Sequence, residues 1–126
     1  MSYDVFFQGF KGGEAALGGG GTVRAVLEPY VARPGPEHSF LRIDVEDGGA
    51  DAYLSDDHMM VNHAGGRSTW DLLVRAAAAA NWTILLPDGS TAVTNENQRA
   101  ELPPELVTGA VLVSSGTELL RVVAGL

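Results

Sequence analysis

Apolar and polar residues alternate in the first half of the chain. Within residues 39–45, the apolar Leu41 and Ile43 alternate with the polar Arg42 and Asp44. Successive side chains of a strand point to opposite faces, so this period of two predicts a strand with one buried face. Residues 47–49 follow with the sequence of a hairpin turn, and residues 50–54 and 58–62 are expected to form two further strands. Together the three strands predict an antiparallel meander.

Apolar residues then recur at every third or fourth position, which is the period of a helix. Gly65 and Gly66 end the preceding strand, and Ser68 is placed to cap the helix with Asp71 as its capping-box partner. Residues 82–86 are apolar nearly throughout and predict a strand that is buried on both faces. In the helix that Ser68 is expected to cap, the side chains expected to be buried are those of Trp70, Leu73, Val74 and Ala77.

The remaining segments give weaker patterns. Residues 3–10 predict a central strand with apolar groups on both faces, and the glycine-rich residues 11–21 predict a mobile loop. A helix capped by Thr22 follows, and Pro29 is expected to kink it or to end it near Glu28. Residues 33–37 are expected to form a connector. In the second half we expect strands over 91–93 and 110–113, a short helix over 96–101 and a final helix opened by Ser115 and Glu118.

These elements predict an α/β fold, with α+β as the alternative class, in a single domain covering residues 1–126. The first half resembles a hairpin-bearing antiparallel region, and the second half alternates strand and helix, which favours some parallel pairing. We therefore expect a mixed sheet of five to six strands, with the meander in its first half and helices packed on it. A chain of this length buries enough surface for one core.

Composition narrows the classes of function. The chain carries 16 acidic and 8 basic residues, a net charge of −8, so nucleic-acid phosphates would be repelled. With no cysteine, disulfides, thiolate metal sites and a cysteine nucleophile are excluded. The N-terminal apolar run is too short for a signal peptide, and the Ala-rich helix is too short to span a bilayer. These observations favour a cytoplasmic protein, with no cofactor, that contacts neither nucleic acid nor membrane.

The one cluster that combines imidazoles with carboxylates lies at the end of the meander. Asp57, His58 and His63 are candidates for acid–base catalysis, and Asp56 with His58 for a metal site. The spacing argues against a joint site, because residues five apart on a regular strand point in opposite directions. A solvated turn followed by a sheet-edge histidine explains the same residues without any chemistry.

Acidic residues concentrate in the early hairpins. Between positions 37 and 57 there are seven of the sixteen acids and a single base, Arg42. Such a face is either ordinary solvated surface or a docking surface for a basic protein. The residues expected to bind a partner are Asp44, Glu46, Asp47 and Asp51.

The opening run Met1–Phe7 and the block Val61–Leu73, with its Val-Asn-His and Trp-Asp-Leu-Leu sequences, resemble small acidic α/β proteins of high-GC actinobacteria. Size, acidity and the mixed pattern are also similar to those of immunity proteins of bacterial toxin systems. The second resemblance implies a non-enzymatic domain that inhibits a basic protein partner. Two alternatives stay open: a small metal-dependent or acid–base enzyme using Asp56, Asp57, His58 and His63, and a homo-oligomeric structural protein, for instance a homodimer pairing through an edge strand.

Overall fold

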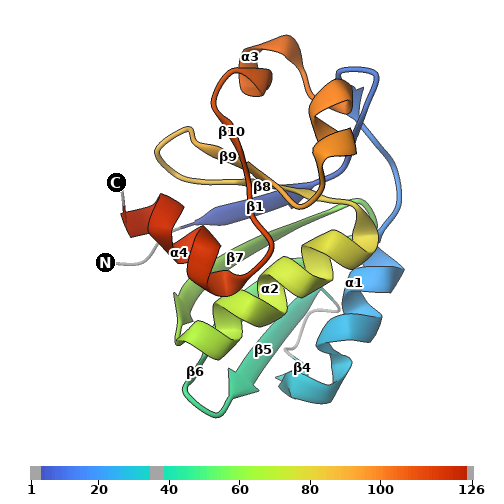
Figure 1. The fold of residues 1–126 in the computed structure, drawn as a ribbon. Helices are drawn as coiled ribbons and strands as arrows, with labels where there is room; N and C mark the ends of the chain where they lie inside the picture. Colours follow the sequence, from blue (N-terminus) through green and yellow to red (C-terminus); the bar gives the residue numbers. More distant parts are fainter. Residues whose placement is uncertain (1–3, 35–38, 125–126) are drawn as a thin grey trace.

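An eight-stranded sheet forms the centre of the molecule, in the order β10-β9-β8-β1-β7-β6-β5-β4 (Figure 1). The computed structural model describes residues 4–34 and 39–124. The sheet has more strands than the five to six expected from the sequence, so that expectation was wrong, whereas the mixed α/β class is confirmed. The strands are β1 (Val5–Gln8), β4 (Val31–Pro34), β5 (Phe40–Val45), β6 (Gly48–Leu54), β7 (His58–Gly65), β8 (Thr83–Leu85), β9 (Thr91–Val93) and β10 (Ala110–Leu112).

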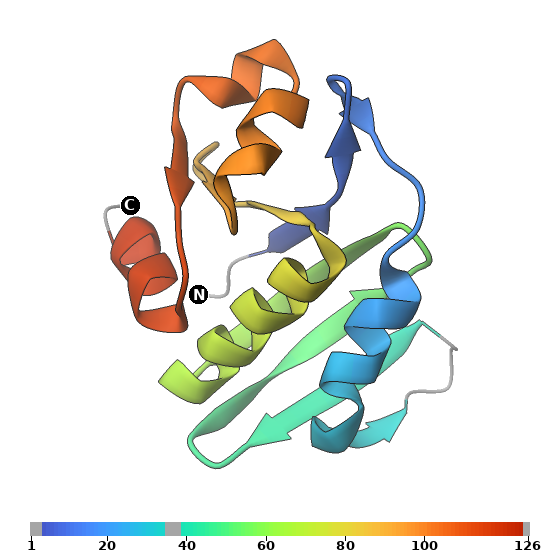
Figure 2. The same ribbon diagram turned by 45° about the vertical axis from the view of Figure 1, so that its right-hand side comes forward.

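The three longer helices lie together on one face of this sheet, as Figures 1 and 2 show. The central helix α2 packs against α1 on one side and α4 on the other. Within the described ranges, no helix combines the length and the apolar character needed to cross a membrane. The helices are α1 (Gly20–Leu27), η1 (Glu28–Tyr30), α2 (Arg67–Ala80), η2 (Glu96–Glu101), α3 (Pro104–Val107) and α4 (Gly116–Ala124).

The topology joins the meander to the second half through β1. The strands β4, β5, β6 and β7 pair antiparallel in sequence order, and β1 pairs antiparallel with both β7 and β8. The strands β7 and β8 therefore run parallel to each other with β1 between them, and α2 forms the crossover. The pair β9 and β10 is parallel, which confirms the expectation of some parallel pairing in the second half.

Two segments fold differently from the sequence-based expectation. The strand β4 occupies part of the expected connector 33–37, and it extends the meander to four strands; residues 35–38 lie outside the described residues. The expected glycine-rich loop contains a two-stranded hairpin of β2 (Phe10–Lys11) and β3 (Glu14–Ala15). The loop then lies on Trp82, whose indole Nε1 donates to the carbonyl oxygen of Gly18 at 3.1 Å.

One face of the sheet is buried under the helices. In β5 the alternation holds as expected, because Leu41 and Ile43 are fully buried. In β1 only alternate residues are buried: Val5 and Phe7 face the helices, while Phe6 is 48% exposed. The expectation of a central strand with apolar groups on both faces is confirmed, because β1 lies between β7 and β8, and one of its two faces is exposed. The main core extends over both halves of the chain, so the sheet and the helices share it.

The helix ends are capped from neighbouring elements. Helix α2 begins at Arg67, and the Asp47 carboxylate accepts a hydrogen bond from the Ser68 N–H at 3.2 Å, so the expected cap by the Ser68 side chain was wrong. Asp71, the expected capping-box partner, instead accepts from the Gly116 N–H at the start of α4, at 2.6 Å. At α4 itself, Ser115 Oγ does accept from the Glu118 N–H.

Candidate functional site

A row of large apolar side chains crosses the sheet on the face opposite the helices. The strand registers place Leu85, Phe6, Met60, Tyr53 and Phe40 next to one another on β8, β1, β7, β6 and β5. Each alternates with a buried neighbour along its strand, so all five share the face opposite α1, α2 and α4. We call these five residues the apolar row.

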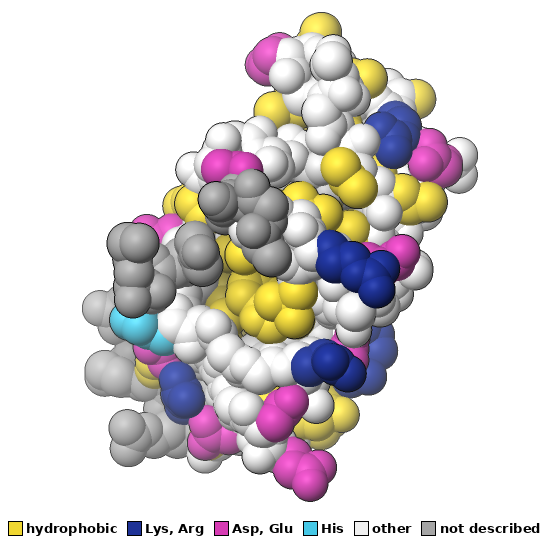
Figure 3. Space-filling view, turned by 60° about the vertical axis from the view of Figure 1, so that its left-hand side comes forward, with side chains coloured by type: hydrophobic (Ala, Val, Ile, Leu, Met, Phe, Trp, Pro, Cys, Tyr) yellow, Lys and Arg dark blue, Asp and Glu magenta, His cyan; other side chains and the backbone are white. Residues whose placement is uncertain are grey.

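The apolar row is accessible to solvent. Phe6 is 48% exposed and Tyr53 is 40% exposed, and the other three members are half-buried. The rings of Phe40 and Tyr53 contact each other with centroids 5.1 Å apart, a tilted arrangement that aromatic pairs favour. Figure 3 shows the neighbouring side of the molecule, which carries the chain ends; apolar side chains line a hollow there, with charged side chains around it.

A polar row runs beside the apolar row. The registers pair Asn62 with Asp51, and Asp51 with Arg42. The Arg42 guanidinium donates to Asp51 Oδ1 at 3.0 Å and to Asp44 Oδ1 at 3.1 Å, so one cation joins two carboxylates. Partial burial opposes ionisation of Asp51, but hydrogen bonds from Arg42 and His63 outweigh it and lower the pKa of this carboxyl. The hydrogen bond to Asp51, with that to Asp44, raises the pKa of Arg42 further.

His63 belongs to this polar row because the strand is irregular there. Its backbone has a φ of 54°, a left-handed value that histidine adopts more readily than most residues. The β6–β7 register shifts at the same place, between Gly49 and Asp51, which marks a β-bulge. The bulge turns His63 Nδ1 toward Asp51 Oδ2, at 3.0 Å. The expectation that His58 and His63 point to opposite faces, which assumed a regular strand, was therefore wrong.

His58 forms a separate cluster at the other end of β7. Its Nδ1 lies 2.8 Å from Asp57 Oδ1 and 3.0 Å from Ser55 Oγ. In a serine-type triad the carboxylate and the hydroxyl contact different ring nitrogens. Here Ser55 Oγ lies almost equally far from both, at 3.1 Å from Nε2, and it also donates to the His58 backbone carbonyl oxygen, so it is not placed on Nε2 alone. The His58 side chain is also 55% exposed, so water surrounds it. The cluster closes a turn between two strands and holds the imidazole on the surface.

The residues considered for metal binding do not converge. His58 and His63 are five residues apart along β7, a separation of about 16 Å on a strand. Asp56 is exposed in the turn, next to a groove of about 460 Å³ that Gly20 and Arg24 also line. Among residues 4–34 and 39–124, no group of three or more His, Asp or Glu side chains is arranged to hold a metal ion.

The acidic residues expected to bind a partner lie along β5, β6 and their connecting turn. Asp44 and Asp51 flank Arg42 on the uncovered face, and Glu46 is exposed in the turn. Asp47 is committed to the N-terminus of α2 through Ser68. The turn that carries Asp56 and Asp57 is at the opposite end of β6, so the acids bracket the sheet instead of forming one cluster.

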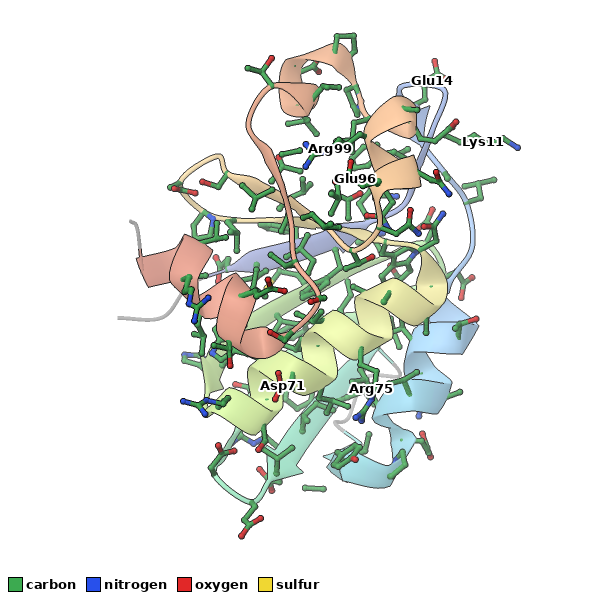
Figure 4. All side chains as sticks on the ribbon, viewed as in Figure 1. Lys11, Glu14, Asp71, Arg75, Glu96 and Arg99 are labelled. Atoms are coloured by element: carbon green, nitrogen blue, oxygen red, sulfur yellow. The ribbon has the colours of Figure 1, made fainter. Side chains whose placement is uncertain are left out.

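A polar groove of about 500 Å³ also lies on the helical face, between η1, α2 and the end of β5. Arg75 contacts Tyr30 there, with its guanidinium carbon 5.9 Å from the ring centroid. Figure 4 shows Arg75 and Asp71 one turn apart on α2, with Asp71 near the first turn of α4. Because these side chains already have partners within the fold, they connect the helices.

Sequence reasoning missed the apolar row. The signal was present in β6 and β7, where Tyr53 and Met60 alternate with the buried Ala52 and Val61. The pairing of β1 between β7 and β8 adds Phe6 to the row, and that pairing joins residues far apart in the chain. A pattern within one strand cannot show which strands become neighbours.

Comparisons of the chain with protein-family models, with curated proteins and with solved structures give no match.

Proposed function

We propose that the protein is a non-enzymatic, acidic protein-binding domain that neutralises a basic protein partner, in the manner of an immunity protein. The observation that carries the proposal is the charge of the antiparallel half. Residues 39–65, which form β5, β6, β7 and their turns, contain six carboxylates and one Arg or Lys side chain. The carboxylates are those of Asp44, Glu46, Asp47, Asp51, Asp56 and Asp57.

The geometry gives these carboxylates two different tasks. Asp44, Asp47, Asp51 and Asp57 have partners within the fold, and the contacts of Asp47 and Asp51 fix the hairpin and its position against α2. Glu46 and Asp56 are exposed and free to act over a distance. Exposed acids attract a basic surface and raise the association rate, and salt weakens this effect because it screens the charges. The partner would therefore approach the hairpin ends first.

Partner capture followed by kinetics tests the proposal. The tagged protein is used to isolate binding proteins from the source organism, and each captured protein is produced pure and its association rate measured at several salt concentrations. We expect a basic partner whose activity is lost in the complex. Glu46→Gln together with Asp56→Asn should slow association several-fold at low salt and flatten its salt dependence, because both changes remove charge while retaining side-chain size.

The matched control uses carboxylates elsewhere. Glu105 and Asp88 lie outside the antiparallel half, and their amide variants change the net charge by the same amount. They should slow association less. Equal effects for both pairs would mean that only net charge matters, and a partner that is acidic, or that remains fully active in the complex, would contradict the proposed function.

A further inference from the structure

We infer that the apolar row on the uncovered sheet face is the central contact of the protein-binding surface, and that its occupant is a protein with an apolar centre and a basic rim. This inference rests on the proposed function and adds where the partner binds. Apolar patches rimmed by polar residues mark interaction surfaces on single domains. The row crosses five strands, about 19 Å at the usual strand spacing, and Phe6 and Tyr53 are its most exposed members.

The arrangement of groups across this face matches the anatomy of a protein interface. Such interfaces have an aromatic, apolar core surrounded by a polar and charged rim. Here Asp51 and Asp44 lie on one side of the row, toward the β5–β6 turn. Asp57 lies on its other side, toward the β6–β7 turn, where it contacts His58. Arg42 is held by two of these carboxylates, so the rim stays acidic overall.

Charge decides between a second copy of this chain and a different protein. Each copy has a net charge of −8, so two copies repel each other, and the repulsion is greatest at low salt. A basic protein removes that penalty and complements the rim. The face would be more stable when covered, because the aromatic rings then leave water. We therefore assign the face to a basic heterologous partner.

The test separates contact energy from charge. Phe6→Ala and Tyr53→Ala leave every charge in place, so association rates with the purified basic partner should stay within about twofold. Dissociation should become about 30-fold faster for each variant, the loss expected when a central aromatic contact is truncated. The controls are Val111→Ala and Leu112→Ala on β10, at 43% and 42% exposure, which should leave dissociation within about twofold.

Further measurements cover folding and the identity of the occupant. A photo-reactive phenylalanine analogue at position 53 keeps an aromatic ring and should crosslink to the partner, whereas the same group at position 111 should not. Circular dichroism and thermal unfolding establish that each variant is folded. Sedimentation of the wild-type protein alone should show a monomer at low and high salt; a dimer that Phe6→Ala dissociates would assign the face to a second copy and overturn the inference.

The outcomes distinguish the two proposals. If a basic partner binds but Phe6→Ala and Tyr53→Ala dissociate as slowly as wild type, the partner contacts another face, and only the present inference fails. If the β10 controls weaken binding as much as the row variants do, the inference fails in the same way. If no basic protein binds the chain, the proposed function fails and this inference fails with it.

Discussion

A buried hydroxyl shows how a single residue sets a local cost. Thr69 on α2 is completely buried, and its Oγ1 finds no hydrogen-bond partner among the described residues. A buried polar group without a partner destabilises the folded state, because it loses its hydrogen bonds to water. The residue therefore offers a test of packing that is independent of function.

Replacing the hydroxyl by a methyl group should stabilise the protein. Thr69→Val keeps the β-branched shape and removes the unpaired oxygen, so we expect the free energy of unfolding to rise by about 1 kcal/mol. Urea denaturation followed by circular dichroism measures the change. The control Thr69→Ser keeps the hydroxyl, loses a buried methyl group and should lower stability by about 1 kcal/mol. A loss of stability in Thr69→Val would indicate that the hydroxyl has a partner in solution.

The polar row predicts a pH dependence that can be assigned to one residue. The pKa of Asp51 in the folded state lies below its ordinary value of 3.8. A lowered folded-state pKa gives stability that is fully present above the unfolded pKa and is lost as pH falls through the folded value. The stability difference between wild type and Asp51→Asn should therefore be largest above pH 4 and shrink below it.

Urea titrations at pH 7, 5, 4 and 3 measure this difference. Glu46→Gln serves as the control, because it removes an exposed carboxylate from the same hairpin without touching Arg42. A difference that is constant over this pH range would show that the Arg42 and His63 contacts do not hold Asp51 ionised.

At the scale of elements, the sequence predicted the regular parts of the fold. The alternation in 39–45 became β5 and the helical period after Gly66 became α2, because each element satisfies its own pattern locally. It did not predict β4, which contains a proline and pairs only through contacts with β5. A proline is compatible with an edge strand, since one side of that strand makes no ladder bonds.

The candidate site, too, has features that the sequence predicted and features that it did not. The acids and histidines were found from residue type, and the turn at 55–57 was placed correctly. The hairpin turn expected at 47–49 lies at 46–47, because Gly48 and Gly49 already belong to β6. The bulge at His63 was not predictable, because it depends on how β6 and β7 align and on a left-handed backbone at a residue other than glycine. The apolar row also depends on strand order. Residue chemistry is thus visible in one sequence, whereas convergence in space requires the pairing of distant strands.

Contacts between elements give a third prediction, at the start of α4. The Asp71 side chain caps this helix from α2, and a Cβ added at Gly116 would lie 2.3 Å from the Asp71 backbone nitrogen. Asp71→Ala should lower the free energy of unfolding by about 1 kcal/mol, the usual cost of losing a cap. Asp71→Asn keeps an acceptor oxygen and should lose less, and Gly116→Ala should destabilise more because the two helices must separate.

Hydrogen exchange locates the effect of these variants. Loss of the Asp71 cap should raise exchange first in the amides of α4, before those of α2 and the central strands. Uniform acceleration over the whole chain would contradict a local role for this contact.

At the scale of the whole molecule, the acidic charge acts on stability as well as on binding. The chain has sixteen acidic and eight basic residues, and in the described residues only a few of the acids form an ion pair with Arg or Lys. The remaining carboxylates repel one another when the chain is compact, and unfolding relieves that repulsion. The same excess that attracts a basic partner therefore weakens the free protein. The ion pairs between an acid and an arginine in the described residues are Arg24–Glu28, Arg42–Asp44, Arg42–Asp51 and Arg99–Glu96.

Screening this repulsion should stabilise the protein. Raising NaCl from 10 to 150 mM shortens the range of charge interactions from about 30 Å to about 8 Å, so we expect the thermal midpoint at pH 7 to rise by about 2 °C. In Glu46→Gln with Asp56→Asn, which has two fewer negative charges, the midpoint should start higher at low salt and rise less. A midpoint that falls with salt would mean that the few ion pairs outweigh the repulsion. The excess of acids would then carry no cost in the free protein, and a basic partner would gain affinity from attraction alone.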